Sequence, residues 1–351
     1  MMKTADLEYC MSSWLMYRTI YDRTKCFFDG ISEYHIMPPA RRIGVHNSSE
    51  LESALNGVLA DVISKRCGKP VALALSGGID SAILAKMVPK GSVAYTFKCI
   101  VPGIDVVDET PQAARYAAEC GIEHRIIEIY WEDMVKLAGK LMKHKGQPIH
   151  SIEVQIYKAS LQALSDGFDS IVFGESADVQ YGGMSGLLSC DWTFGDFVER
   201  YSYVMPYKVL KKYQLVTGPY EEYTQDGYAN AHEFMRNVFF EESINSYANA
   251  CETAGITCVM PFSKTFLAEP LDYMRIRGGE NKYLVREVFN RLYPGWEIPT
   301  KTPMPRPLNE WMKNWAGPTR PEFWPHCTDT MTGDQKWYVY ILEKFLDLID
   351  N

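Results

Sequence analysis

The chain has 351 residues, 46% of them hydrophobic and 13% aromatic, which is enough for one large buried core or two smaller ones. Its formal net charge of −8 gives no general attraction to nucleic acid, and no run of about 18 apolar residues predicts a membrane span. Nine cysteines without a Cys-x-x-Cys pair, and an N-terminus unlike a signal peptide, predict a cytoplasmic protein with reduced thiols.

The first strand-and-helix unit begins with an apolar run over residues 71–75, which predicts a buried strand. The loop that follows reads Ser76-Gly77-Gly78-Ile79-Asp80-Ser81. Its glycines let backbone N–H groups turn toward an anion, and its two serines add hydroxyl donors. Asp80 would repel bound phosphates unless a hard cation such as Mg²⁺ lay between them. The 76–81 loop therefore predicts ATP cleavage with Mg²⁺; the alternative is a tight turn with a serine cap.

Strands and helices then alternate along the chain. Further buried strands are predicted at 92–97, 125–129 and 170–173, and helices at 109–120 and 153–164. This order predicts an α/β fold with a parallel sheet, whose ligands bind at the carboxyl ends of the strands.

A second acidic loop follows the strand at 170–173 directly, and reads Gly174-Glu175-Ser176-Ala177-Asp178. Beyond it, residues 191–255 are aromatic-rich and mostly helical in pattern. The proline-rich stretch 294–325 predicts an irregular surface loop, and 335–349 predicts a terminal amphipathic helix.

Four motifs together resemble the synthetase domain of the asparagine synthetase family, a branch of the PP-loop ATP pyrophosphatases. They are the 76–81 loop, the second acidic loop with Gly182-Gly183, the turn Met260-Pro261-Phe262 and the helix start Lys282-Tyr283-Leu284-Val285-Arg286. The resemblance covers roughly residues 50–345. It implies a PP-loop sheet with added helices, and an enzyme that uses ATP to adenylate a carboxylate, releases pyrophosphate, and transfers ammonia or an amine to give an amide and AMP.

The resemblance also implies a role for each motif residue. Asp80 and Asp178 would hold Mg²⁺ on the leaving pyrophosphate, as two carboxylates at adjacent strand ends suit a hard cation. Lys282 would stabilise charge on the phosphates. Glu175 would deprotonate or bind the attacking ammonia or amine, whereas β-lactam-forming relatives have a tyrosine there.

The ATP-binding residues are predicted around the same strand ends. Ser76, Gly77, Gly78, Asp80 and Ser81 would contact the phosphates. Adenine would be recognised by backbone groups near Leu75, Thr96, Phe97 and Gly174.

Two positions depart from the family pattern. Val179 stands where asparagine-forming members usually have a glutamate, so the acceptor acid need not be aspartate. Full-length members begin with a glutaminase domain whose second residue is a nucleophilic cysteine, but this sequence begins Met1-Met2-Lys3.

The N-terminal residues are interpreted in the light of that second departure. Residues 1–49 would be a non-catalytic remnant of a glutaminase-type domain, with its closing strands at 12–15 and 27–31, followed by the synthetase domain at 50–351. Ammonia would then be free, or supplied by a separate glutaminase subunit.

Several alternatives stay open at this point. Within the same class, the enzyme could be an intramolecular cyclase of the β-lactam or lasso-peptide type. A tRNA-modifying PP-loop enzyme and a non-catalytic subunit are weaker alternatives, since the chain is acidic and keeps all four polar site residues. The expected partners are a small carboxylate and a nitrogen donor, without nucleic acid or membrane; a homo-oligomer is left open.

Overall fold

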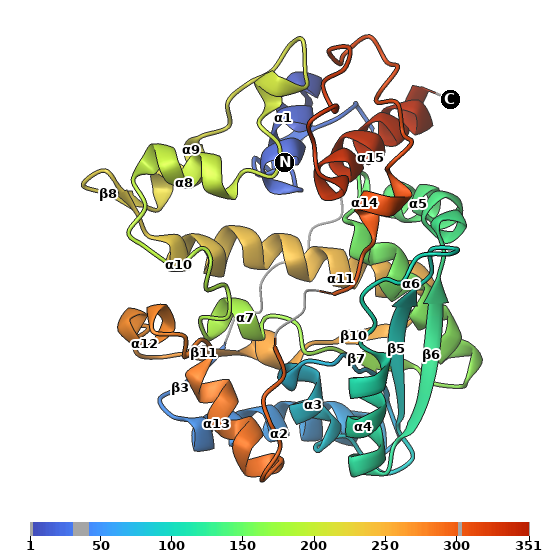
Figure 1. The fold of residues 1–351 in the computed structure, drawn as a ribbon, viewed down its shortest axis with the longest axis vertical. Coiled ribbons are helices and arrows are strands. Elements are labelled where there is room, and N and C mark those ends of the chain that lie inside the picture. Colours follow the sequence, from blue (N-terminus) through green and yellow to red (C-terminus); the bar gives the residue numbers. More distant parts are fainter. Residues whose placement is uncertain (1–2, 31–41, 301–303, 351) are drawn as a thin grey trace.

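A computed structural model describes residues 3–30, 42–300 and 304–350. The central feature is a five-stranded parallel sheet in the order β10-β7-β4-β5-β6, seen on the right of Figure 1. Its strands are β4 (Ala72–Ala74), β5 (Val93–Cys99), β6 (Glu123–Ile129), β7 (Ser170–Val172) and β10 (Thr257–Val259). The sheet confirms the predicted α/β class. β4 lies at its centre, where Leu73 pairs with Ala94 on one side and Val172 on the other.

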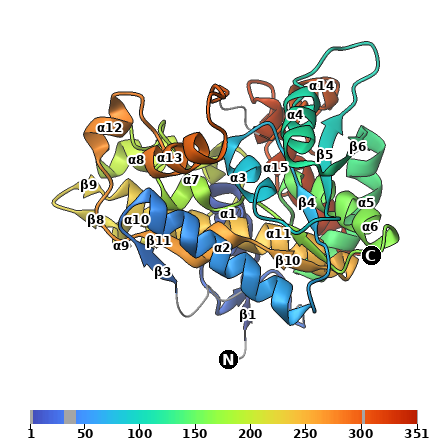
Figure 2. The same cartoon turned by 90° about the horizontal axis from the view of Figure 1, so that it is seen from below.

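Helices cover both faces of the sheet, so the core strands read as continuous apolar runs. Side chains of β4 alternate between the two layers: Leu73 belongs to one hydrophobic cluster and Ala72 to the other. One face is covered by α3 (Ile79–Ala85) and α4 (Thr110–Cys120), with α13 (Tyr283–Leu292) and α2 (Ser48–Lys65) packed outside α3. Figure 2 shows α2 and α13 crossing this side. The other face is covered by α6 (Ser151–Ser165), with α5 (Trp131–Lys145) and α11 (Phe240–Ala254) behind it.

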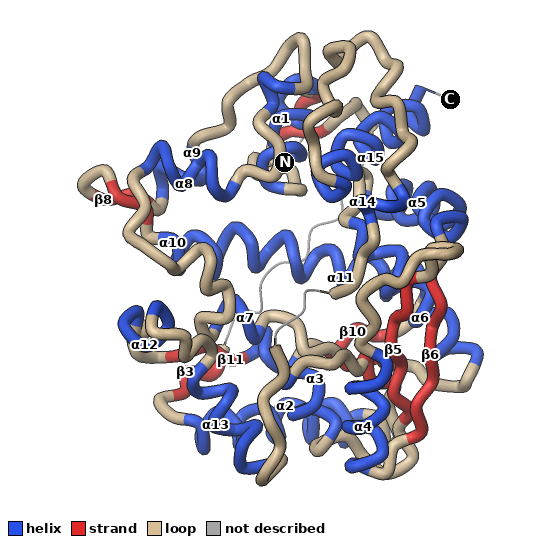
Figure 3. Tube along the Cα trace, in the orientation of Figure 1, coloured by secondary structure: helices blue, strands red, loops and turns tan. Residues whose placement is uncertain are grey.

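A long insertion between β7 and β10 supplies the predicted helical region. It contains α7 (Ala177–Gln180), α8 (Phe194–Tyr201), α9 (Gly218–Glu222), α10 (Ala231–Phe234) and α11, a π-helical turn at Met235–Phe239, a 3₁₀ turn at Pro206–Lys208 and the hairpin β8 (Thr224–Gln225) to β9 (Tyr228–Ala229). Helix α11 crosses the molecule between the sheet layer and an upper layer of helices and long loops (Figures 1 and 3).

The upper layer joins the two ends of the described chain. It contains α1 (Leu7–Tyr17), α14 (Leu308–Trp311), the parallel pair β1 (Thr4–Ala5) and β2 (Lys25–Cys26), and α15 (Gly333–Asp350). Helix α15 confirms the predicted terminal helix. The smaller elements below are β3 (Ile43–Val45) paired with β11 (Thr265–Leu267), the 3₁₀ turn Pro261–Lys264, and α12 (Tyr273–Arg277). No helix among the described residues is both long and apolar enough to cross a bilayer.

The prediction of a closing strand at residues 12–15 is wrong. These residues lie inside α1, which begins where the Asp6 side chain accepts a hydrogen bond from the Tyr9 N–H. Residues 10–17 are buried on every side of the helix, and a short run that is apolar on all faces has no periodicity to separate helix from strand. The second predicted strand, at 27–31, is also wrong over its described part, because residues 27–30 form a bend and a turn that follow β2. Ile31 lies outside the described residues, as does Pro303 of the proline-rich loop. The domain boundary at residue 49 stays a prediction.

Helix α1 is part of the core rather than an appendage. Trp14 is fully buried, donates its indole N–H to the Tyr338 carbonyl of α15 at 3.2 Å, and meets the Tyr338 ring edge-on. Replacing Trp14 with alanine would leave a cavity at the contact between the two ends of the chain.

We expect Trp14→Ala to lower the free energy of unfolding by about 3–5 kcal/mol, because it removes a fully buried indole. Urea denaturation would measure this, with Trp324→Ala as the control, since Trp324 is 47% exposed. Equal stability of the two variants would contradict the integration of α1 into the core.

Candidate functional site

The two acidic loops lie side by side because β4 and β7 are neighbours in the sheet. The 76–81 loop leaves the carboxyl end of β4, and the 174–178 segment leaves that of β7. Since parallel strands end at the same edge, both loops meet there, as the sequence predicted. The edge is thus built from two chain segments almost a hundred residues apart.

Hydrogen bonds between its own serines hold the 76–81 loop in shape. The Ser76 N–H donates to Ser81 Oγ at 3.0 Å, the two hydroxyls are also 3.0 Å apart, and the Gly78 N–H donates to Ser76 Oγ at 3.1 Å. Helix α3 begins after Gly78 without a side-chain cap. The serines therefore shape the loop, and the structure does not support the alternative of a simple serine-capped turn.

Gly174 allows the second loop to approach the first closely. A Cβ atom at this position would lie 2.9 Å from the Ser81 backbone nitrogen and 3.1 Å from the Asp80 Cβ. Real Cβ atoms do not come that close to backbone, so only glycine fits here. The contact brings the Asp80 and Asp178 segments together.

Lys282 connects the two acidic loops. Its Nζ lies 2.7 and 2.9 Å from the Asp80 carboxylate oxygens and 3.0 Å from Asp178 Oδ1. Burial by itself would lower the pKa of Lys282, but the two carboxylates outweigh it and hold that pKa above its ordinary value. The ammonium therefore stays charged.

The lysine reaches this position through unusual backbone. Lys282 immediately precedes α13 with φ of 51°, in the left-handed region. Gly183 leaves the necessary space, because a Cβ there would lie 2.0 Å from Asp178 Oδ1 and 2.7 Å from Lys282 Cδ. This explains physically why the motif ends in Gly182-Gly183.

Glu175 lies next to this cluster and faces α11. The Ser243 hydroxyl donates to Glu175 Oε1 at 2.8 Å. Burial raises the pKa of Glu175, hydrogen bonds from Ser243 and the Ser176 N–H offset part of the shift, and nearby Asp178 adds to it. A carboxylate with a raised pKa is a stronger base than an ordinary glutamate.

The residues predicted to recognise adenine include Leu75, Thr96 and Phe97, and the structure places them in or directly after two neighbouring strands. Leu75 is buried, and its N–H and C=O already bond to Tyr95 and Thr96 of the next strand. Thr96 and Phe97 lie inside β5, which continues to Cys99, two residues beyond the predicted end. The Thr96 hydroxyl also lies 2.8 Å from His124 Nε2.

Sequence reasoning missed Glu109, the residue just before α4. Its carboxyl group accepts a hydrogen bond from the Gly77 N–H, so a negative side chain faces a loop whose composition suits phosphate. Burial raises the pKa of Glu109 to about 7, against the effect of that hydrogen bond. No motif marks this residue; only the packing of α4 beside α3 brings it to the loop.

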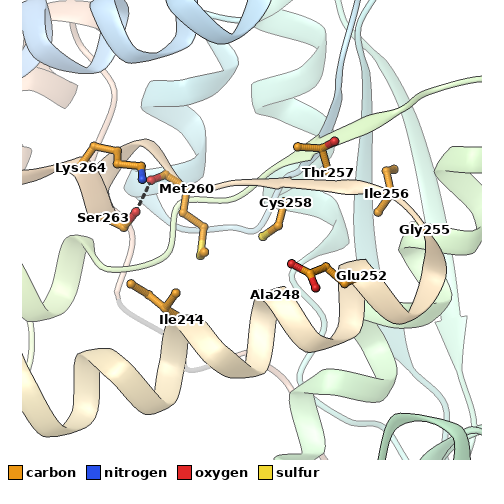
Figure 4. Close-up of a pocket in the computed structure, with 10 residues that line it drawn as sticks. All are labelled: Ile244, Ala248, Glu252, Gly255, Ile256, Thr257, Cys258, Met260, Ser263 and Lys264. Atoms are coloured by element: carbon orange, nitrogen blue, oxygen red, sulfur yellow. Dashed lines mark hydrogen bonds between the residues drawn. The ribbon is translucent and has the colours of Figure 1, made fainter. Parts of the chain in front are cut away.

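The cavity drawn in Figure 4 lies elsewhere. It has a volume of about 490 Å³ and lies between α11 and β10, with Ile244 and Ala248 on the helix side and Cys258 and Met260 on the strand side. None of the predicted site residues lines it.

Asp80 and Asp178 fit a magnesium ion in donor chemistry. Both carboxylates converge on one point, the Lys282 ammonium, and Mg²⁺ in proteins is held by one or two carboxylates together with substrate phosphates. Among the described residues no group of three or more His, Cys, Asp or Glu side chains forms an all-protein metal cage.

This parallel sheet, with a Ser-Gly-Gly loop after its central strand, defines the class as a nucleotide-binding α/β fold of the PP-loop type. Residues 54–319 match the sequence model of the asparagine synthase family. Because the match spans well over half of the chain, the protein belongs to that family. Membership supports an ATP-using enzyme of the ligase type. A comparison with curated proteins found no match.

Three solved structures that the chain resembles are distant from it in sequence. NH3-dependent NAD synthetase from Campylobacter jejuni is 15% identical (TM-score 0.27; 39% of this chain, 61% of that one), and glutamine-dependent NAD+ synthetase from Acinetobacter baumannii is 23% identical (0.28; 39% and 26%). NMN synthetase from Francisella tularensis is 13% identical (0.29; 74% and 99%). The match thus spans less than two thirds of either NAD synthetase. Likenesses this distant carry no information on the substrate.

We expect ATP binding to weaken roughly tenfold as the pH rises through about 7, because Glu109 is neutral below its pKa and negative above it. Glu109→Gln should abolish this pH dependence. Titration of the protein with Mg-ATP at a series of pH values would measure it.

Glu119→Gln is the matched control, since Glu119 lies near the end of α4, the helix that Glu109 precedes, but pairs with Lys86 at the surface. A Glu109→Gln variant with the wild-type pH profile would contradict the assignment.

Proposed function

We propose that this protein is an ATP-dependent, AMP- and pyrophosphate-forming amide synthetase, which adenylates a carboxylate and transfers ammonia or an amine to it. One observation carries the proposal: the Lys282 ammonium lies between Asp80 and Asp178, and partly buried Glu175 lies close enough to Asp178 for that carboxylate to raise its pKa. A positive charge suited to phosphates, on Lys282, and a carboxylate base, Glu175, therefore lie at the same edge of the sheet. Family membership supports the ATP-using part.

In the first step a substrate carboxylate oxygen attacks the α-phosphorus of ATP, and the bond to the β-phosphate breaks to release pyrophosphate. The 76–81 loop would bind the leaving phosphates, and for this its Gly77 N–H would exchange its hydrogen bond to the Glu109 carboxyl group for one to a phosphate oxygen. Lys282 would stabilise the charge that builds on them, since its pKa is held above the ordinary value. Asp80 and Asp178 would hold Mg²⁺, which when bound neutralises phosphate charge.

In the second step the nitrogen attacks the acyl carbon, and AMP leaves. Glu175 would take the proton that the nitrogen loses. Its raised pKa suits this role, and Ser243 orients the carboxylate through a 2.8 Å hydrogen bond. The nitrogen would come from free ammonia, an amine or a separate glutaminase.

The environment of Val179 supports an acceptor acid other than aspartate. Val179 is fully buried in the hydrophobic cluster, and its carbonyl lies 3.2 Å from His232 Nε2. A charged side chain at this position would therefore lie in the core rather than face a substrate. We propose that another part of the site recognises the acid.

The two steps can be separated by mutation. We expect Asp80→Asn to lower both ATP–pyrophosphate exchange and amide formation by about a hundredfold or more, since both depend on adenylation. Glu175→Gln should keep the exchange and lose amide formation by a similar factor. Exchange would be measured across a panel of acids, and products by intact mass, which separates a gained amide nitrogen from the water lost in cyclisation.

Asp61→Asn is the control, because Asp61 forms an exposed ion pair with Lys65 on α2. Production of ADP and phosphate instead of AMP and pyrophosphate would refute the proposed function. An Asp80→Asn protein with full turnover would refute the role of that carboxylate.

A further inference from the structure

The strand β10 forms one outer edge of the central sheet, and no role described so far uses this β10 edge. The Thr257 N–H donates to the Asp169 carbonyl at 3.0 Å, on the side of β7. The Val259 carbonyl accepts from the Phe173 N–H at 2.9 Å, on the same side. Since successive residues of a strand turn their backbone groups to opposite sides, the N–H and C=O of Cys258 point away from the sheet. No further strand of the described chain pairs with them.

The two outer strands of the sheet differ in how they are protected from pairing with another chain. The strand at the opposite edge, β6, contains Glu123, His124, Arg125 and Glu128. In contrast, β10 reads Thr-Cys-Val, without a charge or a proline, and Thr257 is exposed. Charged side chains and prolines are the usual means by which edge strands avoid pairing with other chains. The β10 edge lacks both.

Cavities border the β10 edge on both faces of the sheet. The cavity in Figure 4, of about 490 Å³, lies between β10 and α11, and a second one, of about 300 Å³, lies between β10 and α2. Thr257, Cys258, Met260 and Lys264 line both of them. The strand therefore has open space beside it on each face, which suits the addition of a further strand.

Apolar side chains from the two helices line these cavities. Ile244 and Ala248 of α11 border the first cavity, and Val58 and Val62 of α2 border the second. Removing water from apolar surface is favourable, so a protein surface that covered both cavities would gain free energy.

Two charged side chains lie toward opposite ends of the larger cavity (Figure 4). Glu252 is on the last turn of α11, before β10 begins, and Lys264 lies in the turn after β10 ends. Both are exposed, and neither has an ion-pair partner within the described ranges. Nearby Lys65, in contrast, pairs with Asp61 at 2.7 Å. The larger cavity thus has an unpaired positive charge at one end and an unpaired negative charge at the other.

A second copy of this chain matches this arrangement of charges. If two β10 strands pair antiparallel about Cys258, each Cys258 N–H donates to the Cys258 carbonyl of the other copy. Antiparallel pairing also places the start of one strand beside the end of the other. Lys264 of one copy would therefore lie beside Glu252 of the second copy, and this contact would occur twice because the interface is symmetric.

We propose that the β10 edge is a dimer interface, at which two copies of this chain pair their β10 strands antiparallel and join their sheets. A peptide from another protein could also bond to β10, but three residues offer few hydrogen bonds. A second copy adds two attractive contacts between Lys264 and Glu252. No residue of the two acidic loops takes part, so the dimer does not depend on the proposed reaction.

Reversing one charge at a time tests this pairing. Sedimentation velocity over a range of protein concentrations would measure the Kd of the dimer. We expect Lys264→Glu and Glu252→Lys each to raise that Kd about tenfold or more, since each places like charges opposite one another at two symmetric contacts. The double variant restores the attraction and should recover the wild-type Kd.

Lys212→Glu is the matched control for the change in net charge. Lys212 is an exposed lysine whose ion-pair partner, at 4.0 Å, is Glu8 of α1 in the upper layer. This variant should leave the Kd unchanged. Because Lys264 and Glu252 are exposed, we also expect their variants to keep the wild-type Tm, which would show that a change in Kd does not come from unfolding.

Cysteine cross-linking tests the register of the strands without a change of charge. Cys258 lies opposite its own copy in the proposed pair, with the two Cα atoms about 5.5 Å apart. A short bismaleimide reagent should therefore join two chains when the exposed Cys67 and Cys190 are replaced by serine. Cys258→Ser in the same background should abolish this product.

The outcomes that would overturn the dimer are distinct. A wild-type protein that stays monomeric up to millimolar concentration would do so. A dimer whose Kd is unchanged in both single variants, or is not recovered in the double variant, would also overturn it, as would a cross-linked product that does not need Cys258. Enzymatic activity enters none of these measurements, so a failure of the proposed function would leave the result for the β10 edge unaffected.

Discussion

The candidate site depends on one interaction, the contact of the Lys282 ammonium with the carboxylates of Asp80 and Asp178. A buried ammonium without such partners would lose its proton or destabilise the fold, so the carboxylates are needed to keep it charged. This contact can form only if other parts of the chain have particular features. β4 and β7 must be neighbours, and glycines must stand at 174 and 183 so that the loops and the lysine can approach.

Helix α11 connects this edge to the upper layer of the molecule. Consecutive residues of the helix serve the two sides, since Glu242 pairs with Arg18 and Ser243 bonds to Glu175. Neighbouring residues on a helix point about 100° apart, so one rigid element can hold two polar groups at a defined separation. This gives a physical reason for a long helix with so many buried polar residues, including Ser246 and Asn249.

Much of the fold was predictable because its signals are local. The apolar run before Ser76 predicted a strand, and Gly121 ends the helix that was predicted to stop at Cys120. The strand assigned to residues 12–15 was wrong for the opposite reason: a segment buried on all sides carries no period, and its helical state depends on packing against α15.

The sequence by itself determined the parallel α/β class, the family and the polar residues of the two loops, since these follow from short motifs and from alternating patterns along the chain. Only the tertiary structure decided which charges meet. Glu109 reaches Gly77 because α4 packs beside α3, and Arg18 meets Arg306 on His150 because the two chain ends fold together. Contacts between residues far apart in sequence depend on the packing of whole elements, which no local pattern records.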